Sequence, residues 1–96
     1  MNTLLTAVYD SGMDERVIET LEDMGLSGWT RLFGAHGLGG AGRRQNTPIW
    51  PGTVNVLYVA GERGELEKLA AALRALPASY TLNPGLTMWM APVEMR

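Results

Sequence analysis

The sequence predicts an α+β sandwich in which a four-stranded antiparallel sheet carries two helices on one of its faces. Two kinds of pattern lead to this fold class. Apolar runs typical of buried strands occupy residues 3–9 and 53–60. Residues 13–24 and 62–76 instead repeat apolar side chains at the spacing of an amphipathic helix. Strand-like and helical segments therefore alternate along the chain.

The first strand and the first helix follow each other directly. The strand over residues 3–9 ends at the turn-forming Asp10-Ser11-Gly12, and Ser11 is placed to cap the next helix. Gly25 is a natural stop for that helix. Its apolar face comprises Met13, Val17, Ile18, Leu21 and Met24. Its acidic residues are expected to form a solvated surface: Asp14, Glu15, Glu19, Glu22 and Asp23.

The two middle strands are joined by a long connection. Residues 28–33 are rich in aromatic side chains and include a β-branched threonine, which favours a strand. Residues 53–60 are the clearest strand of the chain, and Pro51-Gly52 ends the loop before them. The connection is therefore loop 34–52.

The second helix and the last strand complete the pattern. The helix over residues 62–76 is rich in Ala and Leu, and Pro77 closes it. Its buried face is expected to comprise Leu66, Leu69, Ala70, Leu73 and Leu76. Asn83-Pro84-Gly85 has turn chemistry, and residues 86–93 form a strand that is interrupted near Pro92.

The order strand, helix, strand, strand, helix, strand predicts one topology. Two halves with right-handed crossovers give the ferredoxin-like arrangement. A chain of 96 residues is expected to be a single domain, residues 1–96. Because both helices lie on one face, apolar side chains on the other face need a partner subunit to cover them.

Composition excludes several classes of function. With no cysteine, the chain has no thiolate for metal binding or catalysis. The formal net charge is −2, and because loop 34–52 holds two arginines and no acid, the remainder carries −4. This balance disfavours nucleic acid but not one small anion. Residues 1–10 resemble neither a signal peptide nor a membrane span, so we expect a cytoplasmic protein. Nothing in the sequence calls for a cofactor.

Loop 34–52 is the segment whose sequence gives the strongest indication of function. It is longer than a turn between two strands requires, and such connections are commonly binding loops. Its glycines allow the backbone to approach a ligand closely, and successive free N–H groups can converge on an anion. Arg43 and Arg44 reinforce this preference for negative charge. A solvated loop without a ligand is the alternative.

The strand order, the long middle loop and its glycine motif together resemble the PII signal-transduction superfamily. Residues 24–30 resemble that family's helix-to-strand passage, and residues 37–43 resemble its Gly-x-Gly-Arg loop base. Trp50-Pro51-Gly52 is similar to the end of the loop in a small short-loop subgroup. The resemblance implies a homotrimer that binds a small effector, often an adenine nucleotide, between subunits. It also implies that the loop is recognised by a partner protein.

The resemblance assigns candidate effector contacts to the loop: Gly37, Gly39, Gly40, Gly42, Arg43, Arg44 and Gln45. Two registers of the motif stay open, with either Gly40-Ala41-Gly42-Arg43 or Gly37-Leu38-Gly39 as the loop base. Nucleotide-binding members carry a lysine in a second glycine-rich loop, whereas residues 77–85 contain neither Lys nor Arg. One phosphate contact of the family is therefore missing.

Trp50, Pro51 and Gly52 are interpreted as an anchor of the loop, with Trp50 lying against a neighbouring subunit or against an adenine ring. His36 is a candidate metal ligand only if three copies meet at a trimer axis or if carboxylates complete the site. No Ser, Asp or Glu in the loop forms a nucleophile and base, so no enzyme is expected. The leading hypothesis is an effector-binding regulator. The alternatives are a trimeric scaffold without a ligand and a metal sensor.

Overall fold

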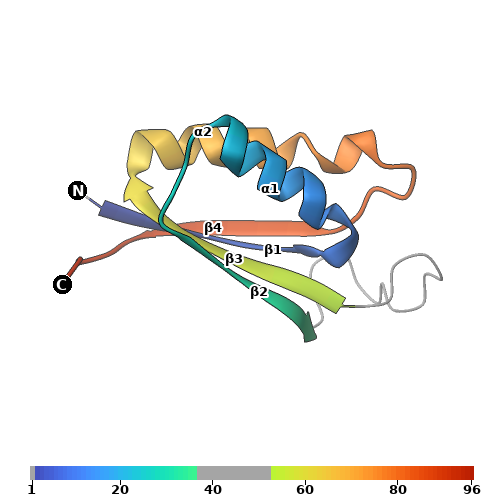
Figure 1. The fold of residues 1–96 in the computed structure, drawn as a ribbon, viewed down its shortest axis with the longest axis horizontal. Coiled ribbons are helices and arrows are strands. Elements are labelled where there is room, and N and C mark those ends of the chain that lie inside the picture. Colours follow the sequence, from blue (N-terminus) through green and yellow to red (C-terminus); the bar gives the residue numbers. More distant parts are fainter. Residues whose placement is uncertain (1, 37–52) are drawn as a thin grey trace.

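The computed structural model describes residues 2–36 and 53–96, and in them it has a four-stranded sheet with two α-helices. The sheet order is β2-β3-β1-β4 (Figure 1). The elements are β1 (Asn2–Asp10), η1 (Ser11–Met13), α1 (Asp14–Asp23), β2 (Trp29–His36), β3 (Thr53–Glu62), α2 (Arg63–Arg74), η3 (Pro77–Ser79) and β4 (Leu86–Pro92).

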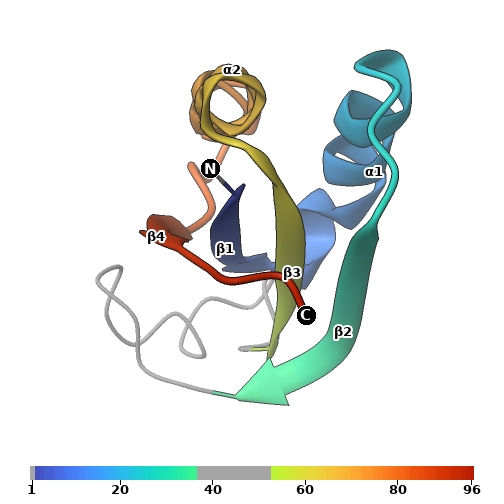
Figure 2. The ribbon, with the colours of Figure 1, turned by 90° about the vertical axis from the view of Figure 1, so that its left-hand side faces the viewer.

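The predicted fold class is confirmed. β1 pairs antiparallel with both β3 and β4, and β2 pairs antiparallel with β3. Both helices lie on the same face of the sheet (Figure 2). The helices and the sheet thus form two layers, and β2 and β4 are the outer strands.

The core lies between these two layers. Alternate residues of the central strands point toward the helices, because successive strand side chains face opposite sides. Its fully buried members are Leu5, Ala7, Tyr9, Met13, Val17, Leu21, Leu57, Val59, Leu66, Leu69 and Leu73. The predicted apolar faces of both helices are therefore confirmed, with Ile18, Met24, Ala70 and Leu76 packed at the margin.

The two ends of α1 differ in how well they match expectation. Gly25 has a φ of 67° and stops the helix as predicted. Its N–H donates to the Glu22 carbonyl and the Leu26 N–H donates to the Leu21 carbonyl, which is a Schellman motif. The predicted cap at the other end is wrong. Ser11 lies in η1, and its hydroxyl is engaged with β3 instead of the helix.

β2 is longer than the predicted strand 28–33, so loop 34–52 begins three residues too early. The extension contains a β-bulge, because Leu32 pairs with Val56 whereas Ala35 pairs with Val54. Gly34 adopts a φ of 68° within it. This left-handed conformation suits glycine, and the bulge bends the end of the strand.

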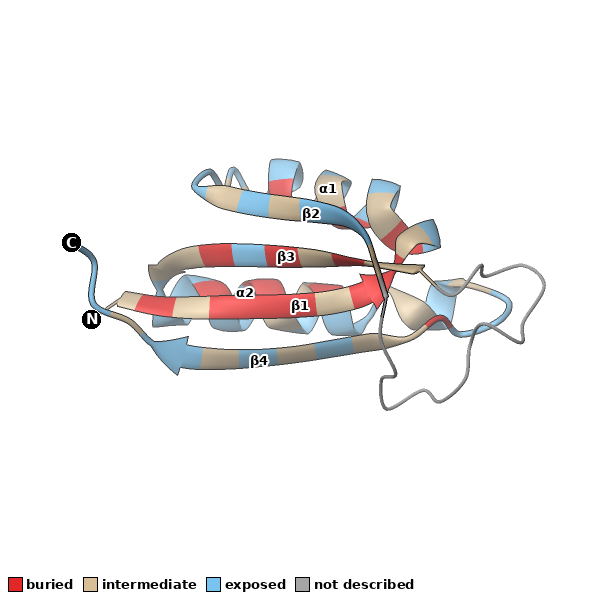
Figure 3. Ribbon diagram, turned by 90° about the horizontal axis from the view of Figure 1, so that it is seen from below, coloured by how far each residue is buried: buried red, intermediate tan, exposed pale blue. Residues whose placement is uncertain are grey.

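Figure 3 shows the helix-free face of the sheet, on which exposed and partly exposed residues lie along all four strands. One row of residues in register crosses all the strands: Thr30, Tyr58, Thr6 and Trp89. The adjoining row is Leu32, Val56, Val8 and Thr87. Trp89 is 53% exposed and Leu32 50%, so large apolar side chains face outward here. We call these two rows the open face.

No helix among the described residues is both long and apolar enough to cross a membrane.

Candidate functional site

The candidate site lies where β2 ends and β3 begins. His36 pairs with Thr53 there, so these two strands hold the two ends of the segment 37–52 side by side. The end of β1 and η1 lie at this same end of the sheet (Figure 1). Residues from three parts of the sequence therefore meet where the segment leaves the sheet.

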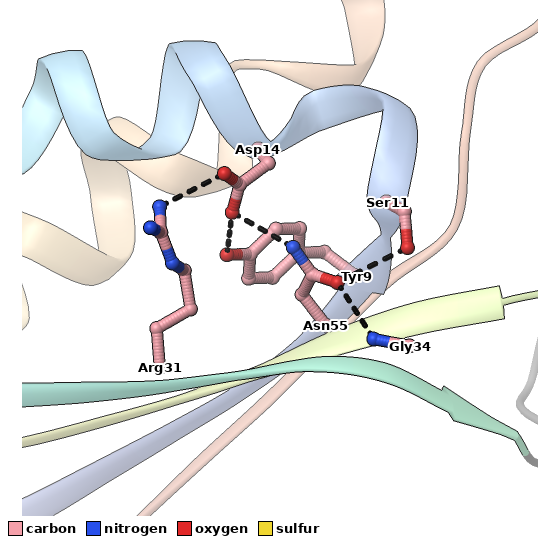
Figure 4. A network of polar contacts seen from close by, with 6 residues as sticks. All are labelled: Tyr9, Ser11, Asp14, Arg31, Gly34 and Asn55. Atoms are coloured by element: carbon pink, nitrogen blue, oxygen red, sulfur yellow. Dashed lines mark hydrogen bonds and ion pairs between the residues drawn. The ribbon is translucent and has the colours of Figure 1, made fainter.

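Asn55 is at the centre of the contacts. Its side chain is almost fully buried on the helix side of β3. The carbonyl oxygen Oδ1 accepts hydrogen bonds from the Gly34 N–H at 3.3 Å and from the Ser11 hydroxyl at 3.1 Å. The amide Nδ2 donates to Asp14 Oδ1 at 2.8 Å. One side chain thus joins β2, β3, η1 and α1 (Figure 4).

Asp14 gathers three donors at the start of α1. Besides Asn55, Oδ1 accepts a hydrogen bond from the Tyr9 hydroxyl at 2.7 Å, and Oδ2 receives Arg31 Nη1 at 2.8 Å (Figure 4). A carboxylate in the first helical turn is also stabilised by the helix dipole. We call Tyr9, Ser11, Asp14, Arg31, Gly34 and Asn55 the polar network. The expectation that Asp14 belongs to a solvated acidic surface is wrong.

The side chain of Arg31 extends from the outer strand β2 to Asp14 at the start of α1. Its guanidinium carbon lies 4.3 Å from the centre of the Phe33 ring and 5.8 Å from that of Trp29, which is cation–π geometry. The side chain is only 23% exposed. Since Asp14 is similarly covered, this ion pair is screened less by solvent than a surface pair.

Tyr9 is the titratable group that the network perturbs most clearly. Burial and the hydrogen bond to Asp14 raise the pKa of its phenol well above the ordinary value. Both effects favour the neutral hydroxyl, because ionisation would place a phenolate beside a carboxylate. Tyr9 is therefore a permanent hydrogen-bond donor in the physiological range.

This raised pKa predicts a loss of stability in alkali. The unfolded chain releases the Tyr9 proton near pH 10, whereas the folded chain retains it, so stability is complete below that pH and falls above it. We expect the free energy of unfolding to fall by about 1.4 kcal/mol per pH unit above pH 10. Urea titrations between pH 8 and 11.5 measure this.

The Tyr9→Phe variant is expected to flatten that part of the curve, and Tyr58→Phe on the open face serves as the control. Burial also raises the pKa of Tyr80, so a smaller slope remains in Tyr9→Phe. Equal slopes in wild type and Tyr9→Phe would contradict the assignment.

A second set of hydrogen bonds joins the turn before β4 to the end of β1. The Gly85 N–H donates to Asp10 Oδ2 at 2.6 Å, and the Asp10 N–H donates to the Gly85 carbonyl at 3.1 Å. Asp10 is buried. The turn over residues 83–85 is thereby held at the same end of the sheet as the polar network.

A shallow open groove runs along α1 beside Arg31. Its charged lining consists of Asp14, Glu15, Glu19, Glu22 and Arg31. Four carboxylates against one guanidinium repel an anion, and that guanidinium is already paired with Asp14. The groove is therefore not the predicted anion site.

The predicted effector contacts Gly37, Gly39, Gly40, Gly42, Arg43, Arg44 and Gln45, and the predicted anchor Trp50, Pro51 and Gly52, lie outside the described residues. The backbone of His36 ends β2. Among residues 2–36 and 53–96, no three His, Asp or Glu side chains are grouped as metal ligands.

The polar network was missed at the sequence level, although the chain carried signals of it. Asn55 is a polar residue at a core-facing position of an otherwise apolar strand, and Arg31 is the one charge within residues 28–33. Buried polar groups are generally hydrogen-bonded, so each implied a partner. Which partner each had depended on the packing of α1 over the sheet.

No protein-family model matches the chain, and no curated protein matches it either. Solved structures do match. TTHA0516 from Thermus thermophilus, provisionally named a PII-like signalling protein, superposes over 94% of this chain and 84% of its own, with a TM-score of 0.66 at 21% identity.

CPII, a nitrogen regulatory PII-like protein from Thiomonas intermedia solved with ADP, AMP and bicarbonate, matches 97% of this chain and 94% of its own (TM-score 0.66, 13% identity). A functionally unknown protein from Pediococcus pentosaceus matches 99% and 94% (TM-score 0.63, 14% identity). The resemblance found in the sequence is confirmed at the level of the fold. The chain has the fold of PII-like signalling proteins.

Proposed function

We propose that this protein is a PII-like regulator, and not an enzyme, that binds a small anionic effector and signals through the segment 37–52 to a partner protein. The observation that carries the proposal is the polar network at both ends of that segment. Hydrogen bonds of the almost fully buried Asn55 to Gly34 and to Asp14 fix the ends of β2 and β3 beside that segment, as a binding loop on a structured scaffold requires. A cytoplasmic location stays a prediction from the sequence.

An adenine nucleotide is the first effector to test. The segment contributes Arg43 and Arg44 without an acid, which suits phosphate groups. CPII, which has the same fold, was solved with ADP and AMP. Residues 77–85 lack Lys and Arg, so a bound phosphate would have only the two arginines of the segment as cationic contacts from these two parts of the chain.

We further propose that three copies assemble through the open face. Leu32, Tyr58 and Trp89 are large apolar side chains that project from it, and the two rows that define it contain no charged residue. Exposed apolar patches of this kind mark interaction surfaces. A single domain of residues 1–96 would then be one subunit of a homotrimer.

Calorimetric titration with ATP, ADP and AMP tests the effector. We expect at least one to bind, and we expect Arg43→Ala or Arg44→Ala to weaken it about tenfold, the value of one charge-assisted hydrogen bond. Arg63→Ala is the matched control, because Arg63 lies on α2 and pairs only with Glu67 among the described residues.

Two outcomes would contradict the proposal. Equal weakening by Arg63→Ala would indicate attraction by overall charge instead of a site. If neither these nucleotides nor a wider set of metabolites and metals raises the melting temperature, the ligand-independent scaffold replaces the regulator, because any ligand of the folded state must stabilise it.

A further inference from the structure

We infer that β2 opens and closes as a unit while the rest of the domain stays folded, and that the ion pair of Arg31 with Asp14 holds it closed. We call this ion pair the latch. The inference goes beyond the proposed function and does not depend on it. β2 is an outer strand, and in the described part of the chain β3 is its only strand neighbour. Its opening would leave β3, β1 and β4 paired as they are.

Little apolar surface holds β2 in place. None of residues 29–35 is buried, whereas β1 and β3 both contribute fully buried side chains to the core. Trp29 is the residue of β2 that packs against the margin of the core, while β4, the other outer strand, packs Leu86, Met88 and Met90 there. Segments with few buried apolar contacts open at a low free energy. β2 is therefore the strand that we expect to open first.

Asp14 keeps two of its three donors when β2 leaves. The Tyr9 hydroxyl comes from β1 and the Asn55 amide from β3, and both donate to Oδ1. Arg31 is the donor that comes from β2, and it contacts the other oxygen, Oδ2. Because Asp14 lines the open groove along α1, water can replace the guanidinium there. The carboxylate thus stays hydrogen-bonded in the open state.

Asn55 is likewise left with a partner at each end of its amide. Its Oδ1 would lose the Gly34 N–H of β2 but keep the Ser11 hydroxyl, and its Nδ2 would keep Asp14. The contacts of the polar network thus divide into those from β2 and those that persist without it (Figure 4). Since a buried polar atom without a partner is costly, this division lowers the free energy of opening.

The latch is the charged contact that opening breaks. Arg31 Nη1 lies 2.8 Å from Asp14 Oδ2, and both side chains are largely covered. The rings that stack on the guanidinium, Trp29 and Phe33, belong to β2 itself, so these contacts move with the strand. A charge-assisted hydrogen bond is stronger than a neutral one. The latch therefore contributes more to closure than any single neutral hydrogen bond of β2.

The test must separate the latch from self-association. Thr30 and Leu32 of β2 belong to the open face, so assembly there would hold the strand from its other side. All variants are therefore made in the Trp89→Glu background, at a concentration where sedimentation shows single chains. Trp89 lies on β4, at the opposite edge of the sheet from β2. If wild type is already a single chain, the proposed trimer fails and the same comparisons are made in wild type.

Amide hydrogen exchange measures the opening. We expect those amides of residues 29–32 that pair with β3 to exchange at least about tenfold faster than the Leu5 amide of β1, which is paired on both sides. Arg31→Met keeps the apolar stem but removes the latch, and it should speed exchange of residues 29–32 about tenfold further. Arg31→Lys keeps a positive charge for Asp14, so its effect should be smaller.

Leu69→Val is the matched control. A substitution speeds exchange through an opening only if that opening breaks its contacts. Leu69 is fully buried on α2, in the part of the core that stays folded when β2 opens. The loss of one buried methylene should therefore speed exchange at Leu5 about fivefold and leave residues 29–32 unchanged.

Three results would overturn the inference. Exchange of residues 29–32 as slow as that of Leu5 would show that β2 does not open separately. Equal acceleration of both sets of amides by Leu69→Val would show that β2 opens only when the whole domain unfolds. Unchanged exchange of residues 29–32 in Arg31→Met, with the variant folded by circular dichroism, would remove Arg31 from its role.

Discussion

Replacing Asp14 with alanine is expected to destabilise the protein by about 3 kcal/mol. The substitution leaves three donors without their acceptor: the Tyr9 hydroxyl, the Asn55 amide and the Arg31 guanidinium. Removing one partner of a largely buried ion pair costs more than the pair itself contributes, because the remaining charge stays uncompensated. Each unsatisfied neutral donor adds its own desolvation cost.

Urea unfolding followed by circular dichroism measures this loss. The midpoint should fall without a change in the dependence on urea, because the extent of the buried surface stays the same. Glu15→Ala is the matched control. It removes the neighbouring carboxylate of the same helical turn, which is exposed, and should change stability by less than about 0.5 kcal/mol. Similar losses in both variants would show that helix charge, not the network, is responsible.

Placing a glutamate at Trp89 is expected to abolish self-association. Trp89 is 53% exposed on the outer strand β4, at one end of the row of the open face that continues through Thr6 and Tyr58. An interface built there would bury the new carboxylate without a partner, at a cost of several kcal/mol for each copy. We expect association to weaken by at least about a hundredfold.

Sedimentation equilibrium checks this result. Wild type should have three times the mass of the 10.4 kDa chain, and Trp89→Glu should have the mass of a single chain. Leu82→Glu is the control, because Leu82 is a comparably large apolar side chain, 37% exposed, that lies in the turn before β4 and away from the open face. A single-chain mass for wild type at micromolar concentration would contradict the trimer.

The secondary structure was largely predictable because it depends on local patterns. The helical spacing of Val17 and Leu21, and of Leu66 and Leu69, was sufficient to identify both helices and their buried faces. Gly25 was recognised as a stop because its left-handed conformation is a local requirement. The bulge at Gly34 was not predicted, since it depends on how β2 pairs with β3.

The partners within the polar network could not be predicted from the sequence either, because they depend on how the elements pack in three dimensions. Asp14 follows the charge pattern of a solvated helix face, and only the packing of α1 turns it toward Tyr9 and Arg31. Ser11 is a residue type that commonly caps helices, but in the fold its hydroxyl donates to Asn55 Oδ1 and not to the start of α1. The effector contacts predicted in the segment 37–52 stay predictions.

Some contacts at this end of the sheet join positions far apart along the chain. Asn55 and Asp14 are 41 residues apart, and the tie between Asp10 and Gly85 spans 75. Such distant pairs form late in folding, because closing long loops costs entropy before the contacts compensate for it. A nascent or truncated chain would have its helices before it had these ties. If the protein is the regulator proposed above, an incompletely folded subunit would not yet respond to its effector.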